Sequence, residues 1–407
     1  MSECVKAKTY QPKKHKLSDI YIKYRSGYLS DKDRCLTIKD RHLEAMRKTE
    51  VCRSLKLGAI LIDCECKKPK FLYHTCKHRF CSTCGSAATY QWAEKTLGNL
   101  IEMPHHHIVM TLPKKLRTLS KMNDNLIHDL LFQISTKVIQ TFFINKYSCL
   151  PGIISVLHTS GSDLKYHPHV HMIVSRGGFL KNKNEYMRIK GDYLVKNEIL
   201  GKSLKQSFEK ELIKLWINGK LKIYKGIGKD FEKWIKGSKE KHWIVNIEKP
   251  LNKVEEIVNY VGRYTKRACI SEYKIEEISP NIKFKYKDYK NSKRGEKPIE
   301  SLITMTPTAF LDKLLQHVPT KRYRMVRYSG LYSSYYSQRI PKDKRAQTSP
   351  LTEHEEAYEW GEMEKMRKHV IKNGYKDFMF CEICQSEKVI IGVVYSTGEI
   401  KHYNDSS

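Results

Sequence analysis

The stretch His167–Val174 reads HPHVHMIV, and the interpretation of the whole chain starts from it. Histidines alternate there with apolar residues, which is the period of two expected of a β-strand. His169 and His171 therefore project from one face of the strand, with Val170 buried behind them. Two imidazoles placed in this way can bind one divalent ion, which would polarise a phosphate oxygen. The alternative is an accidental pair, because the chain has 17 histidines, three of them in a run at 105–107.

A second strand is predicted at 152–158 (GIISVLH), and the turn-rich GSDLKYH between the two strands indicates a β-hairpin. The hairpin makes His158 the nearest third metal ligand, with His167 at the strand entrance as the other candidate. Similar patterns predict strands at 106–112, 241–247 and 300–305, and helices at 41–51, 86–100, 125–143, 200–236, 252–266 and 308–318. Ser86 is the expected N-cap of the second of these helices.

The helix predicted at 252–266 contains two tyrosines, Tyr260 and Tyr264, four residues apart and therefore on one helical face. Arg263 and Arg267 follow them at three residues each, and a guanidinium suits phosphate recognition. A tyrosine can act as a covalent nucleophile when a metal, a base or a cation activates it. An amphipathic helix that uses both tyrosines as core residues is the alternative.

Gly262 lies between these tyrosines and costs a helix interior about 1 kcal/mol relative to alanine. A close approach of a DNA backbone would explain a glycine there. Lys266 adds a third cation to this segment, so it is included among the predicted DNA-binding residues with Arg263 and Arg267.

Six of the twelve cysteines lie between residues 52 and 85, in a region with few helix formers. Zinc binds four nitrogen or sulfur ligands in a tetrahedron, and two close pairs separated by a hairpin can supply them. The spacing favours Cys64, Cys66, Cys81 and Cys84, with Cys76 as the main competitor and Cys52 further upstream. An all-cysteine set leaves no open coordination position, so the predicted role is structural. Buried free thiols, the alternative, would not need such clustering.

Cys381 and Cys384 form a second Cys-x2-Cys unit, which is followed by an apolar strand at 389–395. They supply half of a second candidate zinc site, which His369 and His402 could complete. Two cysteines in a small β-hairpin without metal explain the pattern equally well. The segment 351–364 upstream contains six glutamates and is predicted to be an acidic helix.

The chain has 407 residues, with 75 lysines and arginines against 44 aspartates and glutamates, a net charge of +31. Such a charge opposes compaction unless a polyanion neutralises it, so nucleic acid is the predicted partner. KRYRMVRY (321–328) interleaves cations and aromatic rings as single-strand binders do, although a solvated strand edge explains it equally well. Residues 1–40 are expected to form a basic arm. The sequence shows no secretory signal or membrane-spanning run, which predicts an intracellular protein whose cysteines bind metal.

Together, the histidine strand and the paired-tyrosine helix resemble the HUH endonucleases. More closely, the chain is similar to the rolling-circle insertion-sequence transposases that carry an N-terminal zinc module, bacterial relatives of the Helitrons. The resemblance covers residues 41–335 and rests on motifs in a fixed order. These are LG (57–58), YHTCKHRFCSTC (73–84), HIVMTLP (107–113), VLHTSG (156–161), HPHVHMIV (167–174), GGFL (177–180), YVGRYTKRACIS (260–271) and FLDKLLQHVPTKRYRMVRYSGL (310–331).

The resemblance implies that His169 and His171 bind a catalytic Mg²⁺ or Mn²⁺ and that Tyr260 and Tyr264 are tandem nucleophiles. One tyrosine would attack the scissile phosphate to give a 5′-phosphotyrosine. The sequence departs from the family in its first cysteine pair, which is normally Cys-x2-Cys and here is Cys-x-Cys at 64–66, so the zinc set stays open. The proline of the family's Cys-Pro-x-Cys knuckle is a serine here, which should matter little.

We therefore expect an α+β fold in which a zinc-ribbon-like module precedes an HUH endonuclease domain with a central antiparallel sheet flanked by helices. The expected boundaries are 1–100, 101–345 and 346–407. The expected function is a DNA transposase that nicks and rejoins single-stranded DNA, with structural Zn²⁺ and catalytic Mg²⁺ or Mn²⁺. Its partners would be single-stranded or hairpin element ends and target DNA, in the cytoplasm of a bacterium or archaeon, with the oligomeric state open. A plasmid replication initiator, a mobilisation relaxase and a non-enzymatic zinc-finger DNA-binding protein are the alternatives.

Overall fold

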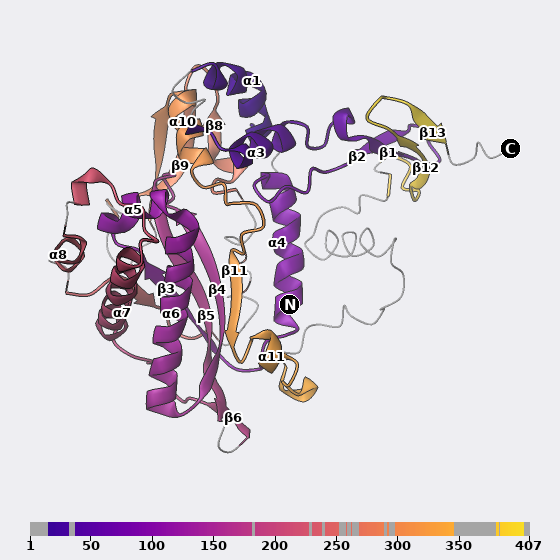
Figure 1. Ribbon diagram of the computed structural model, residues 1–407. Helices are drawn as coiled ribbons and strands as arrows, with labels where there is room; N and C mark the ends of the chain where they lie inside the picture. Colours follow the sequence, from indigo (N-terminus) through magenta and orange to yellow (C-terminus); the bar gives the residue numbers. More distant parts are fainter. Residues whose placement is uncertain are drawn as a thin grey trace.

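The computed structural model describes residues 15–31, 37–180, 184–227, 230–237, 241–251, 258, 262, 268–288, 291–292, 298–345, 380–381 and 383–402. Within these residues the strands form three antiparallel sheets, of six, three and four strands (Figure 1). Helices pack against the six-stranded and the three-stranded sheets, which confirms the expected α+β class with antiparallel sheets.

The six-stranded sheet contains the predicted histidine hairpin and has the order β11–β4–β5–β3–β7, with β6 paired to β5. Its strands are β3 (His105–Thr111), β4 (Leu150–Ser160), β5 (Tyr166–Leu180), β6 (Glu185–Arg188), β7 (Val245–Ile247) and β11 (Val326–Gly330). In the β4–β5 pair His158 lies opposite His169, so the hairpin predicted from the sequence is confirmed.

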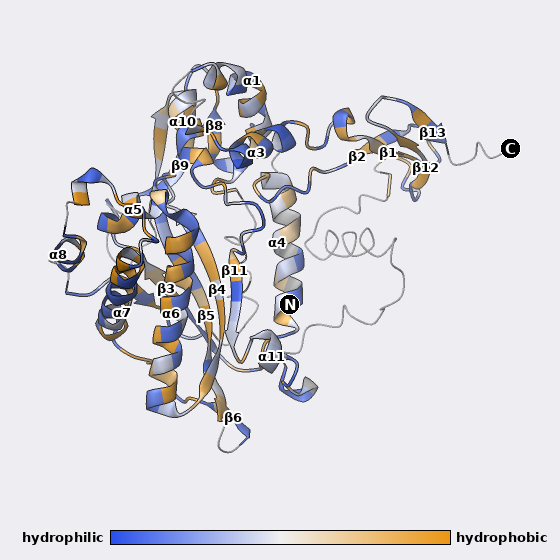
Figure 2. Cartoon of the chain, viewed as in Figure 1, coloured by the Kyte–Doolittle hydropathy of each residue, from blue (hydrophilic) through white to orange (hydrophobic). Residues whose placement is uncertain are grey.

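One face of this sheet is covered by helices that bury its largest apolar core. These helices are α5 (Arg117–Met122), α6 (Asp124–Tyr147), α7 (Asn197–Ile217) and α8 (Phe231–Lys236). Val170 and Met172 of β5 point into this core, which includes Phe143 and Phe208, and Figure 2 shows the matching apolar colour along β4, β5 and α6. Because side chains alternate along a strand, the histidines of β5 face the opposite way. The helix predicted at 200–236 is in fact two helices, since α7 ends at Ile217.

The opposite face of the sheet packs against α4 (Ser82–Leu97) and the short helix α11 (Ser334–Ser337). Trp92 of α4 belongs to one apolar cluster with Val156 and Ile173 of the sheet. The prediction that Ser86 caps this helix is wrong, because α4 begins four residues earlier. The carbonyl of Cys81 already accepts a hydrogen bond from the N–H of Gly85, at 2.8 Å, so the Cys-x2-Cys knuckle itself forms the first helical turn.

The three-stranded sheet packs with helices from the beginning of the chain, and the predicted basic arm is wrong for the residues described there. The elements are β8 (Ile275–Glu277), β9 (Ile282–Asp288), β10 (Ile299–Met305), α1 (Leu17–Leu29), α3 (Asp40–Glu50) and α10 (Pro307–Leu315). Leu17 and Tyr21 are fully buried, in one core with Phe284 and Phe310. The Leu17 N–H donates to the carboxylate of Glu272 at 3.0 Å, which fixes the start of α1.

The four-stranded sheet joins the two ends of the chain. Its order is β13–β12–β1–β2, with β1 (Ala59–Asp63), β2 (Lys70–Tyr73), β12 (Val389–Val394) and β13 (Ile400–His402). Its apolar core is small, with Ala59, Leu61 and Val394 buried. The strand predicted at 389–395 is therefore present, and its neighbour is a strand from the N-terminal part of the chain (Figure 1). Single turns of 3-10 helix lie at Leu55–Leu57, Lys114–Leu116, Lys225–Ile227, Glu272–Lys274 and Lys342–Lys344.

Candidate metal-binding sites

His158 of β4 and His169 and His171 of β5 come together on the sheet face opposite α6. One ring nitrogen from each of the three lies within 4.8 Å of the others. Nδ1 of His158 lies 3.3 Å from Nε2 of His169. The structure thus brings together the three histidines named from the sequence. His167 is not part of this group, and its Nδ1 contacts the guanidinium of Arg117 instead.

Two of these rings are oriented by hydrogen bonds at their outer nitrogens. Nδ1 of His169 lies 2.6 Å from the carbonyl oxygen of His167. A carbonyl only accepts, so Nδ1 of His169 carries the proton and Nε2 carries the lone pair. Nε2 of His158 lies 3.2 Å from the hydroxyl of Ser160, which leaves Nδ1 toward His169.

The third ring, that of His171, is reached through a chain of two further residues that the sequence reasoning did not include. Glu248, just after β7, places Oε2 2.9 Å from Nδ1 of His107. Nε2 of His107 lies 2.9 Å from Nδ1 of His171, and the two rings stack with 6° between their planes. The carboxylate beside Nδ1 of His107 favours a proton on that nitrogen, so we assign Nε2 of His107 as the acceptor of the Nδ1 proton of His171. This order assigns the lone pair of His171 to Nε2.

Burial keeps the three imidazoles uncharged at neutral pH. It lowers the pKa of His169 to about 4, although the hydrogen bond to the His167 carbonyl acts in the opposite direction. Burial, followed by the adjacent imidazoles, holds the pKa values of His158 and His171 well below the ordinary value. Neutral imidazole is the form that binds a metal ion, so the cluster is ready to bind one.

The predicted nucleophiles Tyr260 and Tyr264, with Arg263, Lys266 and Arg267, lie outside the residues that the structure describes. Two positions beside them are described. Val258 is fully buried in the apolar cluster that includes Val156 and Ile173, each two residues from a histidine of the group. A Cβ on Gly262 would lie 3.4 Å from both Thr89 and Trp92 of α4. The described surroundings of Gly262 are therefore protein side chains, whereas the sequence reasoning expected a DNA backbone.

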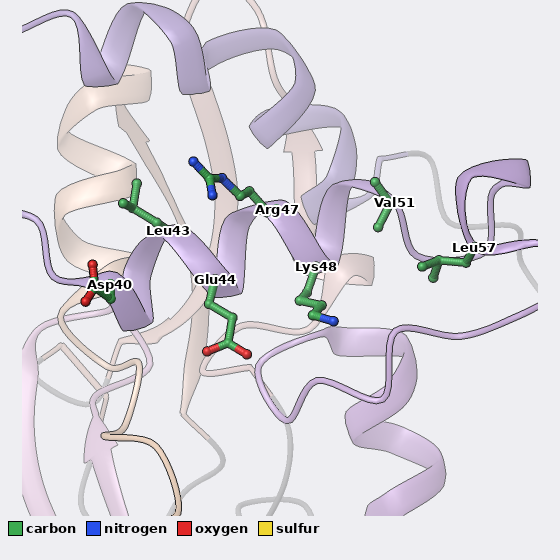
Figure 3. Close-up of a pocket in the computed structure, with 7 residues that line it drawn as sticks. All are labelled: Asp40, Leu43, Glu44, Arg47, Lys48, Val51 and Leu57. Atoms are coloured by element: carbon green, nitrogen blue, oxygen red, sulfur yellow. The ribbon is translucent and has the colours of Figure 1, made fainter. Parts of the chain in front are cut away.

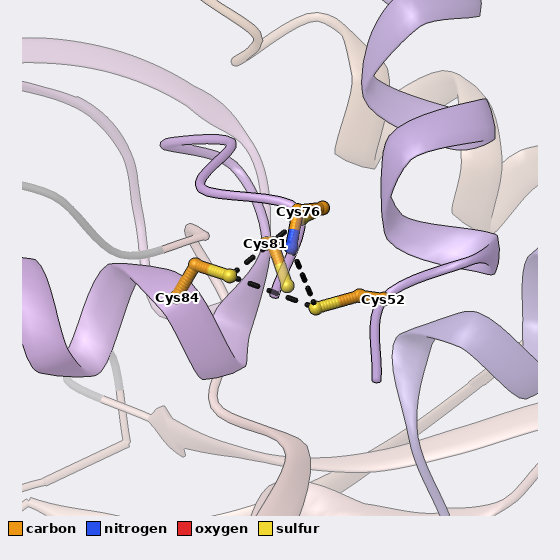
Figure 4. Close-up of side chains that lie close together, drawn as sticks. All are labelled: Cys52, Cys76, Cys81 and Cys84. Carbon is orange, nitrogen blue, oxygen red and sulfur yellow. Dashed lines mark hydrogen bonds between the residues drawn. The ribbon is translucent and has the colours of Figure 1, made fainter. Parts of the chain in front are cut away.

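The predicted zinc set is wrong, because the favoured cysteines do not meet at one point. Cys52, Cys76, Cys81 and Cys84 form one group, with all sulfur atoms within 4.8 Å of one another (Figure 4). Sγ of Cys84 lies 3.6 Å from Sγ of Cys52 and 3.6 Å from Sγ of Cys76. A Zn–S bond of about 2.3 Å in a tetrahedron requires sulfur atoms about 3.8 Å apart. The competitor Cys76 and the upstream Cys52 thus take the two places assigned to Cys64 and Cys66.

Cys64 and Cys66 instead lie with Cys381 and Cys384 in a second group, again with all four sulfur atoms within 4.8 Å. The suggestion that histidines complete this site is not supported for His402, whose side chain is exposed on β13. His369 lies outside the described residues. Each group therefore consists of cysteines alone.

Two further surface features bear on DNA binding. In the segment 321–328, Tyr323 and Arg327 both contact the carboxylate of Asp129, and Arg327 stacks 4.3 Å from the ring centre of Phe132. The segment includes the edge strand β11, where Tyr328 remains 44 % exposed. A hollow along α3 is lined by Asp40, Leu43, Glu44, Arg47, Lys48, Val51 and Leu57 (Figure 3). Two carboxylates balance two cations there, a lining that does not favour a polyanion.

No helix among the described residues is long and apolar enough to cross a membrane.

Comparison with known families gives two matches, one for each kind of site. Residues 20–112, with seven of the twelve cysteines, match the family described as "Transposase zinc-binding domain". Residues 152–339, with the three histidines, match the family described as "Putative transposase". Both matches are to transposase domains: the group of Cys52, Cys76, Cys81 and Cys84 lies in the matched zinc-binding domain, and the three histidines lie in the matched transposase domain.

Two curated relatives agree with this class. A "Putative transposase y4qJ" of Sinorhizobium fredii is 27 % identical over 329 residues, which is 79 % of this chain and 81 % of the relative. The "Transposase for insertion sequence element IS801" of Pseudomonas savastanoi pv. phaseolicola is 28 % identical over 320 residues, 75 % of this chain and 74 % of the relative. No solved structure matches the chain. The chain is thus similar to transposases over about three quarters of its length.

Proposed function

We propose that this transposase nicks and rejoins single-stranded DNA through a 5′-phosphotyrosine intermediate, in rolling-circle transposition. The observation that carries the proposal is the group of three neutral histidines on one face of the β4–β5 hairpin, within the segment that matches the transposase family. Element ends in single-stranded or hairpin form and target DNA are the proposed substrates, and the net charge of +31 favours them.

The residues fit a divalent metal ion. His158, His169 and His171 would bind Mg²⁺ or Mn²⁺, and a bound ion would polarise a phosphate oxygen of the DNA. Metal-bound histidines normally have a hydrogen-bonded partner at the other ring nitrogen, which orients the ring and increases its basicity. All three rings have such a partner here.

His107 and Glu248 are proposed as positioning residues for this site. They hold His171 in the tautomer whose lone pair is on Nε2, although neither would bind the ion itself. His107 is 3 % exposed, so water cannot take its place, whereas Glu248 is 47 % exposed. The contacts therefore lead from His171, a proposed metal ligand, through the buried His107 to the exposed Glu248.

Tyr260 and Tyr264 are the proposed nucleophiles. The hydroxyl oxygen of one tyrosine attacks the phosphorus and loses its proton, the bond from phosphorus to the 3′ oxygen breaks, and that oxygen leaves as a 3′-hydroxyl after gaining a proton. The new ester bond preserves the phosphodiester energy, so a later attack by a 3′-hydroxyl rejoins the strand without ATP. Val258, two residues before Tyr260, is buried in the cluster next to the histidines, which supports a location near them.

The first cysteine group is the proposed structural zinc site of the matched zinc-binding domain. Cys52, Cys76, Cys81 and Cys84 offer four thiolates and no open position for chemistry. Because Cys84 is part of α4, an ion bound there would fix the end of the helix that packs on the histidine face of the sheet.

The test is formation of a covalent protein–DNA adduct. The full chain is incubated with labelled single-stranded DNA from both flanks of its gene, with Mn²⁺ or with EDTA, and run on a denaturing gel. An adduct that needs metal and is lost in the double variant Tyr260→Phe, Tyr264→Phe is expected. Each single variant identifies the tyrosine that cleaves first. Unimpaired DNA binding with no adduct on any strand would contradict the proposal and favour a DNA-binding protein.

The same assay separates the transposase from its chemical rivals. A replication initiator or a mobilisation relaxase would form the same adduct on a plasmid origin rather than on the ends of the element. The names of both curated relatives favour the transposase.

A further inference from the structure

The second cysteine group combines residues from two ends of the chain that no single family match contains. Cys64 and Cys66 lie within the zinc-binding match, which ends at residue 112. Cys381 and Cys384 lie beyond the transposase match, which ends at residue 339. The group is also separate from the first cysteine group, since no cysteine belongs to both.

The sulfur atoms have the spacing of a tetrahedral metal site. Sγ of Cys64 lies 3.0 Å from Sγ of Cys66, which in turn lies 3.7 Å from Sγ of Cys381. All four atoms are within 4.8 Å of one another, around the value of about 3.8 Å that a tetrathiolate zinc ion requires. A disulfide would bring two of them to about 2.05 Å, and all four are free thiols.

The backbone builds this geometry from two tight turns. Each turn follows its first cysteine and ends on a residue with positive φ, Lys67 at +51° and Gln385 at +59°. The Lys67 N–H donates to the Cys64 carbonyl at 2.8 Å, and the Gln385 N–H donates to the Cys381 carbonyl at 3.0 Å. These hydrogen bonds close the two turns that carry both pairs of thiols.

The strand register then places the two turns at the same end of the sheet. Asp63, the last residue of β1, pairs with Val389, the first residue of β12. Gly58, just before β1, permits this pairing, because a Cβ there would lie 2.6 Å from the carbonyl oxygen of Val394. The N–H of Glu65 also donates to the Ser386 hydroxyl at 3.3 Å, which ties one turn to the other.

The sheet that carries these cysteines has little apolar core to hold it together. Among its described residues, Ala59, Leu61, Ile62 and Val394 are buried, while Phe71, Val389 and Ile400 are 44 %, 57 % and 45 % exposed. Small β modules of this kind depend on a metal ion for much of their folding free energy. Cys381, by contrast with these exposed apolar side chains, is 1 % exposed.

We propose that Cys64, Cys66, Cys381 and Cys384 bind a second structural zinc ion, which fastens the C-terminal hairpin to the N-terminal zinc-binding domain. This proposal does not depend on the nuclease chemistry. The protein would then bind two zinc ions per chain, one for each cysteine group. The second ion would link segments 315 residues apart.

The test is the zinc content of the full chain, purified under reducing conditions without chelator and measured by inductively coupled plasma mass spectrometry. Two zinc ions per chain are expected for the natural sequence, and one for the variant Cys381→Ser, Cys384→Ser. The matched control is Cys149→Ser, Cys269→Ser, which changes two cysteines outside both groups and should keep two ions. One ion in the natural protein, or two in the Cys381→Ser, Cys384→Ser variant, would overturn the proposal.

A second measurement keeps the proposal testable if that variant fails to fold. The natural chain is stripped of zinc and titrated with Co²⁺, whose charge-transfer absorption reports thiolate ligands. Growth of the absorption up to two equivalents is expected, and saturation at one equivalent would contradict a second tetrathiolate site. Hydrogen exchange locates the effect: in the variant the amides of β1 and β12 should lose protection, while that of Gly85 beside the first group should not.

Discussion

Removing His107 or Glu248 should weaken the binding of Mn²⁺ at the histidine cluster without removing a ligand. Loss of an outer hydrogen-bond partner usually costs 10- to 100-fold in metal affinity, or about 1.4 to 2.7 kcal/mol. The exposed fractions of the two side chains predict which variant loses more Mn²⁺ affinity within that range. His107 is 3 % exposed, so nothing replaces its ring in His107→Ala and the loss should approach 100-fold. Water can reach the position of Glu248, so Glu248→Ala should lose about tenfold.

The assay is isothermal titration calorimetry with Mn²⁺ on zinc-saturated protein without DNA, which keeps it independent of the tyrosine chemistry. Glu211→Ala is the matched control, because Glu211 lies on α7 and pairs with the exposed Lys214 at 2.8 Å. Nitrogen-15 spectra of the histidines provide the direct readout, with the proton of His171 expected on Nδ1 in the metal-free protein. Equal Mn²⁺ affinity in all three variants, or a proton on Nε2 of His171, would refute the reasoning.

Three further results are expected. Burial lowers the pKa of His128 to about 4, so the unfolded state binds the proton first. The contribution of His128 to the free energy of unfolding should therefore fall by about 3 kcal/mol between pH 6.5 and pH 4. Urea unfolding across this range should show a pH dependence that is smaller by that amount in His128→Gln. Gly201→Ala should destabilise the protein although alanine favours helices, because its Cβ would lie 2.3 Å from the carbonyl oxygen of Trp243. Gly262→Ala should be tolerated, because the nearest atoms to its Cβ would be 3.4 Å away. A lower melting temperature for Gly262→Ala than for Gly201→Ala would contradict this. Phe208→Ala should cost about 3 to 5 kcal/mol in the same assay, because Phe208 is fully buried against Trp243, and a cost below 1 kcal/mol would contradict the packing.

The histidine hairpin could be predicted because its signal is local. The alternation of polar and apolar residues along 167–174 determines which face of the strand each side chain occupies. The short turn before this strand determines which strand it pairs with, so His158 and His169 lie opposite each other as predicted. Helix α1 gave no such signal. Its buried side chains Leu17, Ile20 and Tyr21 lie among cations and polar residues, and part of the core that they join, with Phe284 and Phe310, is more than 200 residues away in the chain.

The cysteine sets could not be predicted because ligand choice depends on tertiary pairing. The spacing alone predicts that Cys64 and Cys81 bind the same zinc ion, since each belongs to a close pair of cysteines. In the structure the turn after α3 brings Cys52 to Cys84, and the pairing of β1 with β12 removes Cys64 to the other group. His107 and Glu248 were missed for the same reason, because their contact depends on β3 lying between β5 and β7.

The order of strands in the four-stranded sheet has a consequence for how the molecule is made. β1 lies between β2 and β12, and the contact of Glu65 with Ser386 spans 321 residues of sequence. A chain emerging from the ribosome therefore completes the histidine hairpin and the first cysteine group well before β12 exists. Until then β1 has one open edge and two thiols without their partners, features that promote wrong pairing. The four-stranded sheet contains the first described strand of the chain to be synthesised and also the last. A chain whose translation stops before β12 therefore lacks the partner strand of β1.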